Sequence, residues 1–223
     1  MERMKKTRTG QMDMLNGPLV SKIILFALPL AASSILQQLF NAADVAVVGR
    51  FAGNQALAAV GGNSSVINLL VNLFVGFSVG ANVMIARYIG EGKTEKIQQT
   101  VHTVITMALI CGVILAVLGN GVARPLLQLM NTPDEVLPLA AVYLKIYFGG
   151  MPFFMLYNFG SAILRSIGDT KKPLYCLIVS GIINVGLNLL LVIVFRLGVV
   201  GVAVATVTAN GVSAGMILFF LGR

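Results

Sequence analysis

Six long apolar stretches, separated by short segments of charged and turn-forming residues, run along the chain. Each reaches the roughly 20 residues that a helix needs to cross a bilayer, so we interpret them as membrane-spanning helices. The longer ones imply tilt, or extension beyond the hydrocarbon core. The expected spans are residues 19–48, 56–86, 97–119, 136–163, 174–195 and 199–221, preceded by a cytoplasmic N-terminal segment at residues 1–18. The pattern therefore predicts an all-α integral membrane protein, a bundle of six transmembrane helices.

The first apolar stretch follows basic residues, as it would in a signal peptide. It continues past residue 30 without a small-residue cleavage site, so we interpret it as the first membrane helix. Pro29 and Pro152 fall inside expected spans, where neighbouring helices can satisfy the freed carbonyls. We expect the first helix to bend near Pro29.

Composition supports a membrane location. The chain is 57% hydrophobic and 11% charged, with a mean hydropathy of +0.89, whereas soluble domains carry roughly 25% charged residues. The net charge of +8 sits in short clusters between apolar runs, which favours contact with an anionic membrane surface over nucleic acid. Cys111 and Cys176 lie inside apolar runs, with no spacing that suggests a disulfide framework or a zinc site.

The distribution of basic residues predicts the orientation. The positive-inside rule places the side richer in Lys and Arg in the cytoplasm, so both termini of this multi-pass plasma-membrane protein are expected there. Four basic residues fall on the outer side: Arg50, Arg124, Lys145 and Arg196. The other 12 of the 16 fall on the inner side: Arg3, Lys5, Lys6, Arg8, Lys22, Arg87, Lys93, Lys96, Arg165, Lys171, Lys172 and Arg223.

Polar residues share one face of the first span. Ser34, Gln37, Asn41 and Asp44 follow spacings of three, four and three, which align side chains on a helix. Asp44 is the only acid well inside an expected span, and burial disfavours its charged form. It could therefore load and release a proton or bind a sodium ion. The alternative is an aspartate that caps or snorkels at the outer interface, but acids within membranes generally mark functional sites.

Two pairs of asparagines, each four residues apart, lie inside other spans. Asn68 and Asn72 are expected to form hydrogen bonds between helices, a common role in membrane bundles. For Asn184 and Asn188 the same structural role is the alternative, and we favour a place in the site. Thr206 on the last span could instead bond its own backbone.

Several absences narrow the function. The sequence has no HExxH pair, no Gly-x-Ser-x-Gly elbow and no GxxxxGK[ST] loop. His102 has no second histidine, so no metal site is expected, and no cofactor. We therefore predict that the protein is not an enzyme and that any energy comes from an ion gradient.

Two segments on the inner side resemble each other. Arg87 precedes Gly90 and Glu91, and Arg165 precedes Gly168 and Asp169, at equal spacing. An arginine in the last helical turn and a following glycine favour helix termination. The pattern is consistent either with capping plus positive-inside bias or with a cytoplasmic hinge that couples helix pairs.

The stretch at 164–173, Leu-Arg-Ser-Ile-Gly-Asp-Thr-Lys-Lys-Pro, resembles the L-R-G-x-G-D-T-K-x-P loop of the multidrug and toxic compound extrusion (MATE) family. Leu-Asn-Gly-Pro at 15–18, Ala-Leu-Pro at 27–29 and Asp-Val-Ala-Val-Val-Gly at 44–49 are also similar to that family. So is the 201–206 segment with its upstream asparagines. The order of these motifs along six spans extends the resemblance over essentially the whole chain.

The resemblance implies a secondary antiporter that exports cationic or amphipathic drugs and other xenobiotics in exchange for H⁺ or Na⁺. Asp44 is then the expected ion-coupling residue, and its protonation would shift helix 1 at Pro29 and contract the cavity. Some members carry aspartate where this chain has Asn188, so Asp44 is expected to act as the only carboxylate. The expected cavity-lining residues are Gln37, Asn41, Asn184, Asn188 and Thr206.

Family members have two six-helix lobes, and this chain has one. We therefore expect the N-terminal half of a transporter, with a missing C-terminal six-helix half or, less expected, a second copy as its partner. One alternative is a lipid-linked precursor flippase of the related superfamily, for which Lys145 is the only candidate cavity cation. The other is a non-transporting membrane scaffold, in which Asp44→Asn would have no effect on binding.

Overall fold

The computed structural model describes residues 19–222, except the side chains at 19, 22, 65, 66, 70, 73–75, 77 and 94. The expected N-terminal segment, with its basic residues and the 15–18 motif, lies outside the described residues. The described helices are α1 (Leu19–Phe51), α2 (Asn54–Gly90), α3 (Thr94–Leu129), α4 (Leu137–Gly149), α5 (Met151–Ser166), α6 (Lys171–Asn188), the π-helix η1 (Leu189–Val194) and α7 (Gly198–Leu221).

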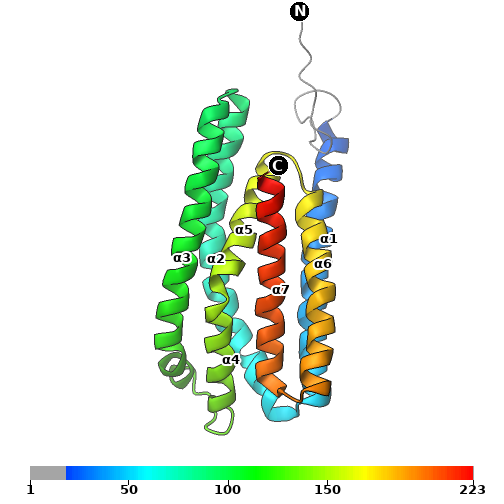
Figure 1. The fold of residues 1–223 in the computed structure, drawn as a ribbon, viewed down its shortest axis with the longest axis vertical. Helices are drawn as coiled ribbons and strands as arrows, with labels where there is room; N and C mark the ends of the chain where they lie inside the picture. The colour runs from blue at the N-terminus through cyan, green and yellow to red at the C-terminus, as the bar shows by residue number, and fades with distance from the viewer. Residues whose placement is uncertain (1–18, 223) are drawn as a thin grey trace, which may run out of the picture.

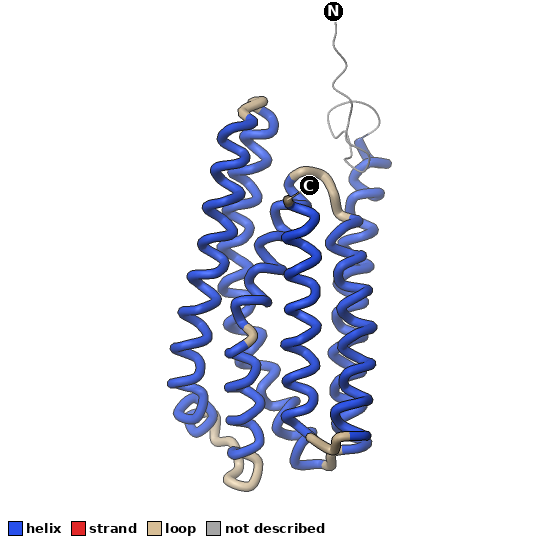
Figure 2. The backbone as a smooth tube through the Cα atoms, in the orientation of Figure 1, coloured by secondary structure: helices blue, strands red, loops and turns tan. Residues whose placement is uncertain are grey.

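The helices run side by side along the long axis and are joined by short loops (Figures 1 and 2). The start of α1 and the end of α7 lie at the same end of the bundle, and the turn between α2 and α3 projects furthest at that end (Figure 1). α5 lies in the interior and contacts α2, α3 and α7. Its Met155 and Ile163 are fully buried, so the core follows this helix.

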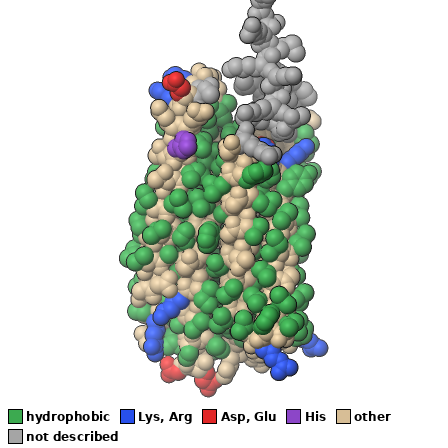
Figure 3. All heavy atoms as spheres, viewed as in Figure 1, with side chains coloured by type: hydrophobic (Ala, Val, Ile, Leu, Met, Phe, Trp, Pro, Cys, Tyr) green, Lys and Arg blue, Asp and Glu red, His purple; other side chains and the backbone are tan. Residues whose placement is uncertain are grey.

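The outer surface suits a bilayer. Apolar side chains cover the middle of the visible face, and charged ones gather toward its two ends (Figure 3). By length and composition, four helical stretches of the described chain could cross a membrane, or five if α4 and α5 count as one bent span. The four are Ile23–Phe51, Glu95–Leu129, Lys171–Val194 and Gly198–Leu221. The remaining expected span, 56–86, corresponds to α2, and part of its apolar stretch has side chains that the structure does not describe.

The expected single helix at 136–163 is two helices. α4 ends at Gly149, α5 begins at Met151, and the pair is bent by 50°. Pro152 stands at the start of α5, where its missing N–H is tolerated. Gly150 lets Val207 of α7 approach, since a Cβ at that glycine would lie 2.5 Å from Val207 Cγ2. The proline and the close contact together explain the break.

Other expected boundaries also change. α3 reaches Leu129, well beyond the expected end at residue 119. The end of the expected 174–195 span is the π-helix η1, in which Phe195 N–H donates to the Leu190 carbonyl. α1 continues through Pro29 without a break, and Ser33 donates to the Pro29 carbonyl at 2.8 Å.

Candidate functional site

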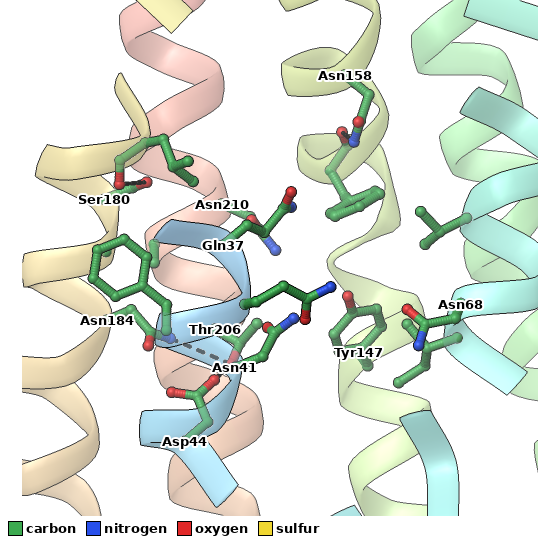
Figure 4. A pocket seen from close by; sticks show the side chains of 18 of the residues that line it. Gln37, Asn41, Asp44, Asn68, Tyr147, Asn158, Ser180, Asn184, Thr206 and Asn210 are labelled. Atoms are coloured by element: carbon green, nitrogen blue, oxygen red, sulfur yellow. Dashed lines mark hydrogen bonds between the residues drawn. The ribbon is translucent and has the colours of Figure 1, made fainter. Parts of the chain in front are cut away.

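A cavity of about 550 Å³ opens between α1, α2, the α4–α5 pair, α6 and α7. Amide, hydroxyl and aromatic side chains from all of these elements point into it (Figure 4). Its lining consists of Gln37, Gln38, Phe40, Asn41, Asp44, Ile67, Asn68, Val71, Asn72, Tyr147, Phe154, Asn158, Arg165, Leu177, Ser180, Gly181, Asn184, Thr206, Ala209 and Asn210.

Asp44 is the only carboxylate among these lining residues, and three side chains from α6 and α7 surround it. Asn188 Nδ2 donates a hydrogen bond to Asp44 Oδ1, and Thr206 Oγ1 lies 3.5 Å from Asp44 Oδ2. Asn184 Nδ2 lies 3.4 Å from Thr206 Oγ1. Asn188 Nδ2 also lies 3.3 Å from Asn184 Oδ1. The cluster therefore joins α1 to α6 and α7 at one wall of the cavity.

The cluster offers few hydrogen-bond donors to the Asp44 carboxylate. Thr206 has one hydroxyl proton, and its oxygen lies 2.9 Å from the Val202 carbonyl, a better acceptor distance than the 3.5 Å to Asp44. When that proton goes to Val202, the Thr206 oxygen can accept a hydrogen bond from a protonated Asp44. Asn188 Oδ1 is buried and has no partner in the described chain. The cluster therefore has spare acceptor capacity that a proton on Asp44, or a small cation, could use.

The structure brings most of the expected residues together. Gln37, Asn41, Asp44, Asn184 and Thr206 line the cavity, and Asn188 contacts Asp44 from behind that lining. Ser34, expected on the same face, is exposed, and its hydroxyl lies 3.2 Å from the Leu30 carbonyl. The π-helix begins directly after Asn188, and π-helical turns occur frequently at functional sites.

The structure relates residues of α2 and α4 to the cavity in ways that spacing did not predict. Asn68 and Asn72, expected to form hydrogen bonds between helices, are exposed and line the cavity. Lys145, the cavity cation that the flippase alternative requires, is exposed and does not line the cavity, whereas Arg165 does. Spacing shows which residues share a helix face but not which neighbour that face meets.

Sequence reasoning also missed Tyr147, Asn158, Ser180 and Asn210, which line the cavity. Asn158 and Arg165 are seven residues apart on α5, a spacing that places them on one face. This spacing could have predicted a polar stripe on the face of α5 that meets the cavity. Among the described residues, no group of three His, Cys, Asp or Glu side chains could hold a metal ion.

The two segments with similar sequences, 87–91 and 165–169, differ in structure. Glu91 pairs with Arg87 at 2.8 Å and Lys93 at 2.6 Å. Asp169 instead pairs with Lys172 at 2.9 Å and accepts a hydrogen bond from the Lys172 amide at 3.1 Å. Asp169 thus anchors the first turn of α6, and Arg165 has no acidic partner in the described chain.

Known proteins of one family match this sequence and fold. The MatE family model matches residues 29–190. The probable multidrug resistance protein YoeA of Bacillus subtilis is 34% identical over 203 residues, which cover 89% of this chain and 44% of the relative. The probable multidrug resistance protein NorM of Thermotoga maritima is 32% identical over 209 residues, 90% of this chain and 44% of the relative.

Solved structures agree. A MATE crystal structure in a bent conformation matches with a TM-score of 0.89 at 28% identity, over 97% of this chain and 48% of that one. A MATE transporter of the MOP superfamily in an inward-facing conformation matches with a TM-score of 0.78 at 26% identity, over 88% of this chain and 45% of that one. The chain thus spans about half the length of the proteins it matches. Since the family model covers most of the chain and the fold aligns with half of a solved transporter, the chain belongs to the MATE family.

Proposed function

We propose that this chain is one lobe of a secondary antiporter that exports cationic or amphipathic drugs in exchange for H⁺ or Na⁺. The observation that carries the proposal is a half-buried carboxylate, Asp44, in the wall of a cavity large enough for a small organic molecule. Asn188 contacts one of its carboxylate oxygens and Thr206 contacts the other. Intramembrane acids in such a setting typically serve ion pathways.

The lining suits a flat cation with an apolar body. Phe40, Tyr147 and Phe154 offer aromatic surface, and aromatic faces attract organic cations. Asn41 and Asn184 add polar groups that can orient a ligand. Asp44 supplies the negative charge. Most of the lining residues are polar, so the aromatic faces supply the apolar contacts while the amides and hydroxyls can orient a ligand by hydrogen bonds.

Coupling follows from competition for one charge. A proton or Na⁺ at Asp44 neutralises the carboxylate and removes the attraction for a cationic drug. A bound drug lowers the affinity for the ion by the same factor, because linkage between two ligands is reciprocal. Ion entry from outside would therefore favour drug release on that side. Asn188 has an amide where a second acid would titrate, so Asp44 is the carboxylate on which this step depends.

Transport requires a second lobe. Alternating access moves two bundles around a site between them, and the relatives that this chain matches are about twice as long as the matched segment. We propose a C-terminal six-helix half, or a second copy of this chain, as that lobe. The assembly would sit in the plasma membrane with the start of α1 and the end of α7 on the cytoplasmic side.

The test is ethidium binding to the chain in lipid nanodiscs between pH 5.5 and 8.5, at fixed Na⁺ and then without it. Wild type should bind ethidium less tightly as pH falls, because protonation neutralises Asp44. Asp44→Asn should bind at least about tenfold more weakly at pH 8, as expected when one partner of a buried charge pair is removed, and should show no pH dependence. Asp134→Asn, an exposed acid outside the cavity, is the matched control.

Measuring efflux as well as binding distinguishes a lobe that only binds the dye, a pair of copies that transports it, and a non-transporting scaffold. Cells that produce the chain alone should bind the dye without pumping it out, since the second lobe is absent. Efflux that Asp44→Asn abolishes would identify a pair of copies as the working unit. Parallel pH curves for wild type and Asp44→Asn would refute the role of Asp44 and favour a non-transporting scaffold.

A further inference from the structure

Arg165 is a cation in the cavity that the proposed exchange does not use. It lies in the last turn of α5 and lines the same cavity as Asp44. Its Nε is buried and has no hydrogen-bond partner among the described residues. The ion pairs of the described chain join other residues, and Asp169, four positions further on, is held by Lys172. The guanidinium is thus a partly buried charge without a counter-ion in the described chain.

Such an arrangement is unfavourable unless an anion completes it. A buried charge without a partner is strongly destabilising, and a guanidinium presents a planar fork of donors that matches a carboxylate. A purely structural arginine at this position would donate to the last carbonyls of α5. No hydrogen bond in the described chain involves the Arg165 side chain, and its Nε is already out of contact with water.

The lining of the cavity therefore includes one carboxylate, that of Asp44, and one guanidinium, that of Arg165, at different depths. Arg165 lies two turns beyond Asn158 on α5, which is roughly 10 Å at 1.5 Å per residue. Asn158 and Asp44 lie at opposite ends of the view in Figure 4, with Asn41, Thr206 and Tyr147 between them. A ligand in this space meets a negative group near α6 and α7 and a positive one near the end of α5.

We propose that the cavity binds zwitterionic amphiphiles, with the ligand's carboxylate on Arg165 and its cationic end toward Asp44. This inference rests on the proposed function and narrows its substrate class. A molecule with both charges would satisfy the unpaired guanidinium, whereas a simple organic cation would leave it unpaired. Ion exchange at Asp44 would still release the ligand, because it removes one of the two charge contacts.

The test compares two dyes that differ only at the carboxyl group. Rhodamine 110 carries a free carboxylate, and rhodamine 123 is its methyl ester. Binding is measured by equilibrium dialysis against nanodiscs of the full chain at pH 8, for wild type, Arg165→Gln, Arg165→Lys and Lys145→Gln. Lys145 is an exposed cation outside the cavity, so its variant controls for the loss of one positive charge.

Wild type should bind rhodamine 110 more tightly than rhodamine 123. Arg165→Gln should weaken rhodamine 110 by about tenfold or more, as expected for a lost charge-assisted hydrogen bond, and leave rhodamine 123 within about twofold. Arg165→Lys should recover part of the difference, because it keeps the charge and loses the fork. Lys145→Gln should match wild type for both dyes.

Rhodamine 123 also reports whether each variant retains a folded cavity. Equal losses of both dyes in Arg165→Gln would assign Arg165 a structural role and overturn the proposal, as would an unchanged preference for rhodamine 110. The proposed function fails in a different way, if wild type binds neither dye or if Asp44→Asn leaves the pH dependence intact, and the inference about Arg165 then falls with it.

Discussion

At the scale of single residues, Glu91 shows how charges are arranged outside the membrane. It directly follows the last residue of α2 and accepts hydrogen bonds from Lys93 at 2.6 Å and Arg87 at 2.8 Å. These two bonds lower the pKa of Glu91 from an ordinary 4.5 to about 2, and the bond from Lys93 has the larger effect. Gly92 (φ 69°) follows in the left-handed conformation that glycine favours. The ion pairs and the glycine together define the tight turn into α3.

This pKa shift predicts a pH dependence of stability. Because the folded-state pKa lies below the unfolded one, the contribution of Glu91 is complete above about pH 4.5 and is lost as the pH falls toward 2. The melting temperature of wild type should exceed that of Glu91→Gln by a small, constant amount above pH 5, and the gap should close toward pH 2.

The pair is exposed, so the gap should also shrink in high salt. Thermal unfolding in detergent, at two salt concentrations across this pH range, provides the measurement. A gap of the same size at pH 6 and pH 2.5 would show that Glu91 does not stabilise the fold through its charge.

At the scale of elements, close helix approaches depend on glycines of α3. A Cβ added at Gly112 would lie 2.5 Å from Pro152 Cα, and one at Gly119 would lie 2.4 Å from the Phe148 ring. The first contact is with backbone, which cannot rotate away. These two glycines therefore let α3 lie directly against the break between α4 and α5, the feature that positions Tyr147 and Asn158 on the cavity wall.

We predict that Gly112→Ala lowers the free energy of unfolding by about 1–3 kcal/mol, the range for overpacking a tight contact. Gly121→Ala is the matched control on the same helix, since nothing lies within 4 Å of its added Cβ. There the higher helix propensity of alanine should leave stability unchanged or raise it by up to about 1 kcal/mol. Reversible unfolding in mixed micelles measures both, and equal effects would mean that α3 can move away from Pro152 at no cost.

The sequence predicted helices and their polar faces better than their contacts. Spacing alone placed Gln37, Asn41 and Asp44 on one face, and all three line the cavity. The break at Gly150 was missed because it depends on Val207, 57 positions away in the sequence. Arg165 was expected either to favour helix termination or to belong to a hinge, since only the folded structure shows that Asp169 pairs with Lys172.

At the scale of the whole molecule, charge is distributed unevenly between the two ends of the bundle. The starts of α1, α3 and α6 and the ends of α2, α5 and α7 lie at one end (Figure 1). Basic residues at that end whose side chains are described are Arg87, Lys93, Lys96, Arg165, Lys171 and Lys172, against Arg50, Arg124, Lys145 and Arg196 toward the other.

This asymmetry predicts that the end of α7 faces the cytoplasm, because the side richer in Lys and Arg is retained there. The full chain should therefore fluoresce with green fluorescent protein fused after Arg223 and show no activity with alkaline phosphatase fused at the same position, since that phosphatase folds only outside the cytoplasm. Active phosphatase would show that the bundle has the opposite orientation in the membrane. Arg165 would then lie at the outer end of the cavity and Asp44 toward the inner one, so an ion arriving from outside would meet the arginine before it reached the carboxylate.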